Sequence, residues 1–154
     1  MQTKSQVIQD SEGSVSLCWL TPSVLYARYE RSLSAEVGQA VAATLQVYAS
    51  RVPSFEFYID ASKLTQYDLR ARSAFIRVVG ARRETFANLV MLAWKGGVTT
   101  SSPQIIQALG EPCEILTDAN EFDLRLLRIV PNAPQILASL RNLAREQRGS
   151  TTTG

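Results

Sequence analysis

The feature that most constrains the fold is a pair of apolar runs separated by a segment with helical periodicity. Residues 55–60 (FEFYID) have the pattern of a buried strand that ends on an acid, and residues 89–94 (LVMLAW) are apolar on both faces. The apolar positions between them are Ala71, Ala74, Phe75, Val78 and Val79. A helix between two strands has the length of a crossover connection, which predicts that the two strands are parallel neighbours.

The flanking segments extend this alternation of strands and helices. The other expected elements are a hairpin within residues 15–29, a helix with Ser34 as N-cap, a helix at 103–109, a strand at 113–117, a helix capped by Asn120, and a C-terminal helix at 134–148. The sequence therefore predicts an α/β fold. We expect a single open, mixed and mostly parallel sheet of about five strands with crossover helices, plus an extra C-terminal helix.

A chain of 154 residues fits one domain whose hydrophobic core needs no metal or disulfide. Residues 1–13 are a polar N-terminal segment, 14–148 the expected domain and 149–154 a flexible low-complexity tail, so both ends are expected to fray. Cys18 and Cys113 fall on separate predicted strands and are interpreted as small buried apolar residues. A cytoplasmic location is the default expectation for such a chain.

Composition excludes several classes of function. The chain has no histidine, which removes Ser-His-Asp and Cys-His catalysis and every His-ligated metal site. A net charge of +2 is too small for a nucleic-acid footprint. No run approaches the roughly 18 apolar residues of a membrane span, and the first residues lack an apolar signal core. We expect no enzyme activity, metal, cofactor, nucleic acid or membrane span.

Polar residues follow the strand predicted at 55–60. In open α/β sheets, ligand and partner sites often lie at the carboxyl ends of such strands. We expect a loop over residues 61–67 and then a helix with Asp68 as its N-cap. Asp60 has two interpretations: a general base or ligand-holding acid, or an acceptor for the amides of the following loop. The second is favoured because no other titratable group is obviously paired with it.

A partner-binding surface is predicted at the start of this helix. Its residues are Thr65, Tyr67, Asp68, Arg70 and Arg72. The alternative is a capped helix whose first turn is merely solvated. Arginine near a helix N-terminus opposes the helix dipole, which costs a few tenths to about 1 kcal/mol of helix stability. This cost supports the interpretation that Arg70 and Arg72 have a role in binding.

A second candidate site precedes the helix predicted at residues 103–109. Lys95, Gly96, Gly97, Ser101 and Ser102 provide amides, hydroxyls and one cation that could cradle an anion at a helix N-terminus. The spacing is not that of a P-loop. An ordinary glycine-rich connection between strand and helix is the favoured interpretation.

The order of a hairpin followed by alternating helices and strands resembles that of STAS domains, the SpoIIAA-like fold of anti-sigma-factor antagonists and stressosome components. The resemblance covers about residues 15–130, and its specific points are the acid-ended strand at 57–60 (FYID), the helix opened by Asp68, and residues 118–122 (DANEF). It implies a non-enzymatic regulatory module that docks a protein partner, such as a kinase-like regulator, a sigma-factor regulator or a signalling complex.

In phosphorylated members of that family, an Asp-Ser-Ser/Thr-Gly turn starts the second helix, and its second hydroxyl residue accepts phosphate from a partner kinase. The aligned turn here reads DLRA, with Arg70 in the place of that hydroxyl residue. The resemblance therefore implies that the family switch is absent. Phosphorylation, if it occurs, is expected at Thr65, Ser62 or Ser73.

Two alternatives to this docking surface stay open. A small-ligand or lipid binder would use a pocket between the strand ends near Asp60 and Lys95, as in the related CRAL-TRIO architecture. The C-terminal helix at 134–148 has an apolar stripe that either packs on its own sheet or docks on a neighbouring chain, which would give a homodimer.

Overall fold

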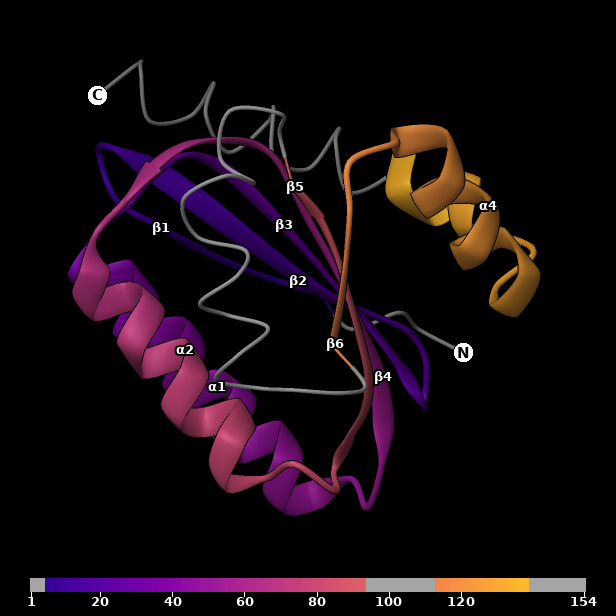
Figure 1. Cartoon of the computed structure of the whole chain (residues 1–154), viewed down its shortest axis with the longest axis horizontal. Coiled ribbons are helices and arrows are strands. Elements are labelled where there is room, and N and C mark those ends of the chain that lie inside the picture. Colours follow the sequence, from indigo (N-terminus) through magenta and orange to yellow (C-terminus); the bar gives the residue numbers. More distant parts are fainter. Residues whose placement is uncertain (1–4, 94–112, 139–154) are drawn as a thin grey trace.

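A computed structural model describes residues 5–93 and 113–138, and Figure 1 shows the arrangement of the chain. The strands are β1 (Ser5–Gln9), β2 (Gly13–Thr21), β3 (Val24–Leu33), β4 (Phe55–Tyr67), β5 (Phe86–Ala93) and β6 (Cys113–Leu116). The helices are α1 (Ala35–Arg51), α2 (Leu69–Ala81) and α4 (Ala119–Ile129), followed by helical residues 133–138.

The six strands form one sheet in the order β1-β2-β3-β4-β5-β6. The pairs β1/β2 and β2/β3 are antiparallel, whereas β3/β4, β4/β5 and β5/β6 are parallel. The predicted open, mixed and mostly parallel sheet is therefore confirmed. The antiparallel hairpin and the parallel relation of the strands that begin near Phe55, Leu89 and Cys113 are confirmed as well.

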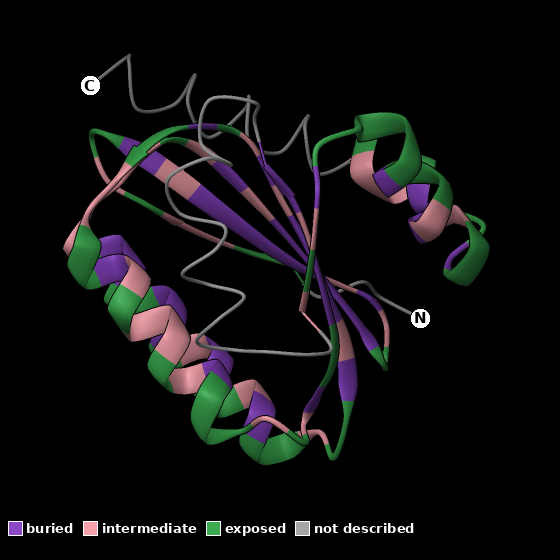
Figure 2. Ribbon diagram, viewed as in Figure 1, coloured by how far each residue is buried: buried purple, intermediate pink, exposed green. Residues whose placement is uncertain are grey.

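Helices cover both faces of the sheet. In Figure 1, α1 and α2 lie next to each other on one face and α4 lies on the other. Two buried clusters correspond to these layers, one with Leu45 of α1 and Phe57 of β4, the other with Tyr58 of β4 and Phe122 of α4. Figure 2 shows that burial is concentrated along the central strands, as expected when both faces of parallel strands are covered.

The two helix starts on the α1/α2 face have the predicted caps. The hydroxyl of Ser34 accepts a hydrogen bond from the amide of Val37, and the carboxylate of Asp68 accepts one from the amide of Arg70. Both caps satisfy amides that have no partner within a helix. The sequence therefore fixes where α1 and α2 begin.

The prediction of a loop over residues 61–67 is wrong, because β4 continues to Tyr67. These residues pair with the long strand β3, with Leu64 opposite Arg31 and Tyr67 opposite Leu33. Leu64 is buried in the α1/α2 cluster, and this burial helps to hold the polar segment in the sheet. The predicted partner-binding residues Thr65 and Tyr67 thus lie on a strand.

Two further expectations need correction. The expectation that residues 5–9 fray is wrong, because they form β1 and pair with β2, so the sheet begins before residue 14. Asp118, not Asn120, is the N-cap of α4, because its carboxylate accepts a hydrogen bond from the amide of Asn120. Aspartate is among the preferred N-cap residues, and an acidic residue is also favourable at the positive end of the helix dipole.

Some predicted features lie outside the described residues. They are Trp94, the helix expected at 103–109, most of the C-terminal helix at 134–148, and the tail at 149–154. Cys18 and Cys113 are both free, and Cys18 is buried, as predicted, whereas Cys113 is half-buried. Burial raises the pKa of the Cys18 thiol to about 11.

Helices α1 and α2 approach each other at Gly38, where a side chain has no room. A Cβ atom on Gly38 would lie 2.2 Å from the Cβ atom of Ala71, whereas one on Gly80, near the end of α2, would meet nothing within 4 Å. The start of α2 is therefore held against α1 by a close contact between small residues. This contact sets the relative position of the two helix starts.

We expect Gly38→Ala to destabilise the fold by about 1–3 kcal/mol, because the helices must separate to admit the methyl group. Gly80→Ala is the matched control and should stabilise by about 0.5–1 kcal/mol through helix propensity alone. The double variant Gly38→Ala/Ala71→Gly should recover part of the loss. Chemical denaturation measures all three, and equal effects of the two alanines would contradict the close contact.

Candidate functional site

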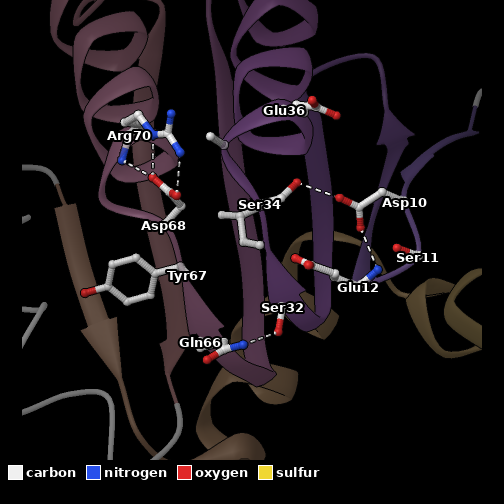
Figure 3. Close-up of a pocket in the computed structure, with 12 residues that line it drawn as sticks. Asp10, Ser11, Glu12, Ser32, Ser34, Glu36, Gln66, Tyr67, Asp68 and Arg70 are labelled. Atoms are coloured by element: carbon white, nitrogen blue, oxygen red, sulfur yellow. Dashed lines mark hydrogen bonds and ion pairs between the residues drawn. The ribbon is translucent and has the colours of Figure 1, made fainter.

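A groove of about 670 Å³ lies where three chain segments meet (Figure 3). Its lining residues are 10–12 in the β1–β2 turn, 32–36 at the β3–α1 junction, and 66–68 and 70 at the β4–α2 junction. Because β3 and β4 are parallel neighbours, their carboxyl ends reach the same edge of the sheet, and each is followed by a helix that begins there. The groove is therefore a direct result of the sheet topology.

Asp10 ties the β1–β2 turn to the start of α1. One carboxylate oxygen, Oδ2, accepts a hydrogen bond from the hydroxyl of Ser34 at 2.7 Å. The other, Oδ1, accepts from the amides of Glu12 and Gly13 at 2.9 and 3.0 Å. The hydrogen bond from Ser34, followed by those from the turn, holds the pKa of Asp10 below its ordinary value. Ser34 thus connects this turn to the helix amide that it caps.

On the other side of the groove, Arg70 folds back onto the cap of its own helix. Its guanidinium donates from Nε to Oδ1 of Asp68 at 3.1 Å and from Nη2 to Oδ2 at 3.0 Å. Figure 3 shows this two-pronged contact. The hydrogen bonds from Arg70 lower the pKa of Asp68, and the Arg70 side chain is still 75% exposed. Its charge is therefore paired with the cap residue, which offsets the unfavourable position of an arginine at the helix start.

The charged lining of the groove is mainly acidic. The acids are Asp10, Glu12, Glu36 and Asp68, whereas the base is Arg70. This local excess of negative charge contrasts with the net charge of +2 of the whole chain. A concave surface lined by one sign of charge attracts the opposite sign.

The backbone at the edge of the groove is irregular. Arg31 has a φ of 64°, and the pairing of β3 with β4 shifts register between Arg31 and Ser32. The carbonyl of Arg31 accepts a hydrogen bond from the hydroxyl of Thr65 at 3.0 Å, and its guanidinium donates to the carbonyl of Ser11 at 3.4 Å. Such irregularities redirect the following residues, here those that lead into α1.

The structure brings together three of the five predicted partner-binding residues. Tyr67, Asp68 and Arg70 line the groove, whereas Thr65 and Arg72 lie outside its lining. Sequence reasoning missed Leu69, the first residue of α2, which is 62% exposed and stands in the chain between two lining residues, Asp68 and Arg70, without lining the groove itself. The available signal was that Leu69 is a large apolar residue off the predicted apolar face of its helix.

Sequence reasoning also missed the contribution of the β1–β2 turn. Asp10 and Glu12 precede the first predicted strand, in a segment that was expected to fray. The sequence DSEG at residues 10–13 was the available signal, because Asp followed by Ser and Gly is typical of a turn that its own side chain stabilises. Nothing in the sequence indicated that Ser34 would be its partner.

Asp60 behaves as the favoured interpretation predicted and does not line the groove. Its Oδ1 accepts hydrogen bonds from the amide and the hydroxyl of Ser62 at 3.0 and 2.6 Å. Among the predicted phosphorylation sites, Thr65 and Ser73 are exposed, whereas Ser62 is half-buried beside this carboxylate. The anion-site residues Lys95, Gly96, Gly97, Ser101 and Ser102 lie outside the described residues.

Within residues 5–93 and 113–138, no group of three or more Cys, Asp or Glu residues is placed to hold a metal ion. No helix in that part of the chain has the length and apolar character needed to cross a membrane.

The Asp10 network predicts a specific response to acid. The pKa of Asp10 is lower in the folded protein than the ordinary value of 3.8. The hydrogen bonds of the Asp10 carboxylate therefore contribute fully to stability when the pH is well above 3.8, and this contribution is lost as the pH falls through the folded-state pKa. The free energies of unfolding of wild type and Asp10→Asn should therefore differ by a constant amount near neutral pH, and the difference should shrink as the pH falls below 3.8. Parallel curves over the whole range would contradict a role for the carboxylate.

Comparison with known proteins gives structural likeness only. No family model and no curated protein matches the sequence. An uncharacterized DUF3478-family protein from Shewanella loihica with a SpoIIAA-like fold is 10% identical and gives a TM-score of 0.50, over 77% of this chain and 89% of that one. The anti-sigma factor antagonist SpoIIAA in its unphosphorylated form is 14% identical, with a TM-score of 0.47 over 81% of this chain and 98% of that one. An anti-sigma factor antagonist from Mycobacterium paratuberculosis is also 14% identical, with a TM-score of 0.44 over 82% of this chain and 95% of that one. The chain has a SpoIIAA-like fold, as the sequence resemblance implied.

Proposed function

We propose that this protein is a non-enzymatic, STAS-like regulatory module that docks a protein partner at the groove between the starts of α1 and α2. The observation that carries the proposal is the combination of an acidic groove with an exposed leucine, Leu69, beside it. Protein interfaces typically join an apolar anchor to a polar rim. A regulatory surface needs no catalytic group.

Three charged residues of the groove, Asp10, Asp68 and Arg70, are positioned before binding by hydrogen bonds within the protein. Asp10 is fixed by Ser34 and two turn amides, and Asp68 is fixed by Arg70. A surface that is organised before binding loses less conformational entropy in the complex. These fixed side-chain positions favour a specific docking surface over the alternative of a helix start that is merely solvated.

The charge of the lining indicates the chemistry of the partner. Four carboxylates and one guanidinium line the groove, and that guanidinium is bound to Asp68. The guanidinium of Arg31, at the edge of the groove, bonds the carbonyl of Ser11, so carboxylates remain in excess. We therefore propose that the partner inserts lysine or arginine side chains into the groove and covers Leu69 with an apolar residue. An arginine of the partner would compete with Arg70 for Asp68. Opposite charges would also speed the association.

The lining is less suited to a lipid or another apolar ligand. Its volume falls within the range of ligand pockets, roughly 300–1,000 Å³, but such pockets are mostly apolar with few polar groups. The pocket that the sequence suggested between Asp60 and Lys95 is a different place, and Lys95 lies outside the described residues. The groove therefore favours the docking function over the ligand-binding alternative.

Phosphorylation at Thr65, Ser62 or Ser73 stays a prediction. Thr65 is the most direct candidate, because its exposed hydroxyl bonds the carbonyl of Arg31 beside the groove. A phosphate there would break that hydrogen bond and add about two negative charges near the start of α2. We propose that such a change would alter docking without altering the fold.

The proposal is tested by reversing charge in the groove. Partner recovered from a lysate of the native host by immobilised wild-type protein, quantified by mass spectrometry, should fall at least ~10-fold with Glu12→Lys/Glu36→Lys. Glu84→Lys is the control for charge reversal away from the groove, because Glu84 is exposed in the turn at the far end of α2. The groove variants Glu12→Lys and Glu36→Lys are also measured singly, so that each is compared with Glu84→Lys at the same net charge. Thermal melts should show that all variants are folded.

A partner that binds the double variant as well as wild type would refute groove docking. So would a partner that Glu84→Lys releases equally, because that result would indicate a general effect of net charge. Raising the salt concentration from about 50 to about 500 mM should also weaken wild-type binding, since exposed charges are screened over a few ångströms at high salt.

A further inference from the structure

The acids that line the groove differ in how their charge is compensated. Asp10 is held by neutral donors, the hydroxyl of Ser34 and two turn amides, so its negative charge is retained. Among the lining acids, and within the described part of the chain, Asp68 alone forms an ion pair, with Arg70. One carboxylate of the groove is therefore neutralised by the protein itself before any partner arrives.

The ion pair engages both oxygens of Asp68. Nε of Arg70 donates to Oδ1 at 3.1 Å and Nη2 donates to Oδ2 at 3.0 Å, so the guanidinium binds the carboxylate in a two-pronged contact (Figure 3). A guanidinium from another chain would use the same two oxygens in the same geometry. Arg70 therefore holds the position that an incoming arginine would take.

The Arg70 side chain can leave without disturbing its helix. It is largely exposed, and an exposed ion pair contributes little to stability because water competes for both charges. The backbone of α2 is held separately. The amide of Arg70 donates to Oδ1 of Asp68, the amide of Ala71 donates to the carbonyl of Asp68, and Ala71 lies close to Gly38 of α1. Only side-chain bonds are lost when the guanidinium swings out.

We propose that Arg70 is an autoinhibitory counter-ion of the groove, which occupies Asp68 in the free protein and is displaced by an arginine of the docking partner. The inference rests on the proposed docking function and adds a regulation of the same site. A partner guanidinium can form the two-pronged contact with Asp68 only after Arg70 has left, and the released Arg70 then repels it. Both effects lower the affinity for basic segments, so an arginine binds well only where other contacts, such as cover for Leu69, support it.

The first test measures the ion pair in the free protein. The hydrogen bonds from Arg70 are the largest cause of the lowered pKa of Asp68. In a pH titration followed by NMR, the pKa of Asp68 should lie below 3.8 in wild type and rise in Arg70→Gln, whereas Arg77→Gln should leave it unchanged. Arg77 is exposed on α2 outside the groove lining, so both variants remove one positive charge from the same helix. An equal pKa in all three proteins would overturn the proposal.

The second test measures binding with defined probes. Peptides from a random library displayed on phage are selected on immobilised wild-type protein, and those that lose binding to Glu12→Lys/Glu36→Lys are kept as groove ligands. These peptides should contain arginine, and fluorescence anisotropy should show that they bind Arg70→Gln about two- to fivefold more tightly than wild type. Arg77→Gln has the same net charge and should change the affinity less than ~1.5-fold.

A variant that conserves charge separates competition for Asp68 from simple repulsion. Arg70→Lys keeps the positive charge but replaces the two-pronged contact by a single ammonium, so its affinity for the peptides should lie between those of wild type and Arg70→Gln. In the Asp68→Asn background, where asparagine still caps the helix, Arg70→Lys should have no effect.

The outcomes separate this inference from the docking function. If the library yields no groove-dependent peptide, docking itself is refuted, and the inference fails with it. If groove-dependent peptides bind Arg70→Gln and Arg77→Gln alike, docking stands and the role of Arg70 is overturned. An effect of Arg70→Lys that persists in the Asp68→Asn background would overturn it as well, because Arg70 would then act through another group.

Discussion

The parallel pairing of β3 with β4 is the constraint on which the rest of the structure depends. It brings the carboxyl ends of both strands to one edge of the sheet, where α1 and α2 then begin. The contact between Gly38 and Ala71 holds the two helices together. The groove is the space that this arrangement leaves between two capped helix starts.

Acidic residues have a double role at this edge. Asp10 and Asp68 stabilise the structure by accepting hydrogen bonds, and with Glu12 and Glu36 they also make the groove negative. Helix starts favour nearby negative charge, so the accumulation of acids costs little in folding stability. The same residues that fix the fold can therefore define the charge of a partner.

Much of the fold could be predicted from the sequence, because caps and apolar periodicity are local signals. Ser34, Asp68 and the apolar run of β5 placed helices and strands correctly. The extension of β4 through Leu64 was missed, because it depends on pairing with β3. The groove was only half predicted: the α2 start was visible in the sequence, whereas the contact of Asp10 with Ser34 joins residues far apart in the chain.

The most direct test of groove docking is site-specific photo-crosslinking in cells of the native host. A photoreactive amino acid in place of Leu69 should crosslink to a partner, whereas the same group in place of Leu124, which is 57% exposed on α4 at the other face of the sheet, should not crosslink to that protein. Peptide mapping of the product should find the crosslink in a segment rich in lysine or arginine. A partner captured at Leu124 and not at Leu69 would contradict the account.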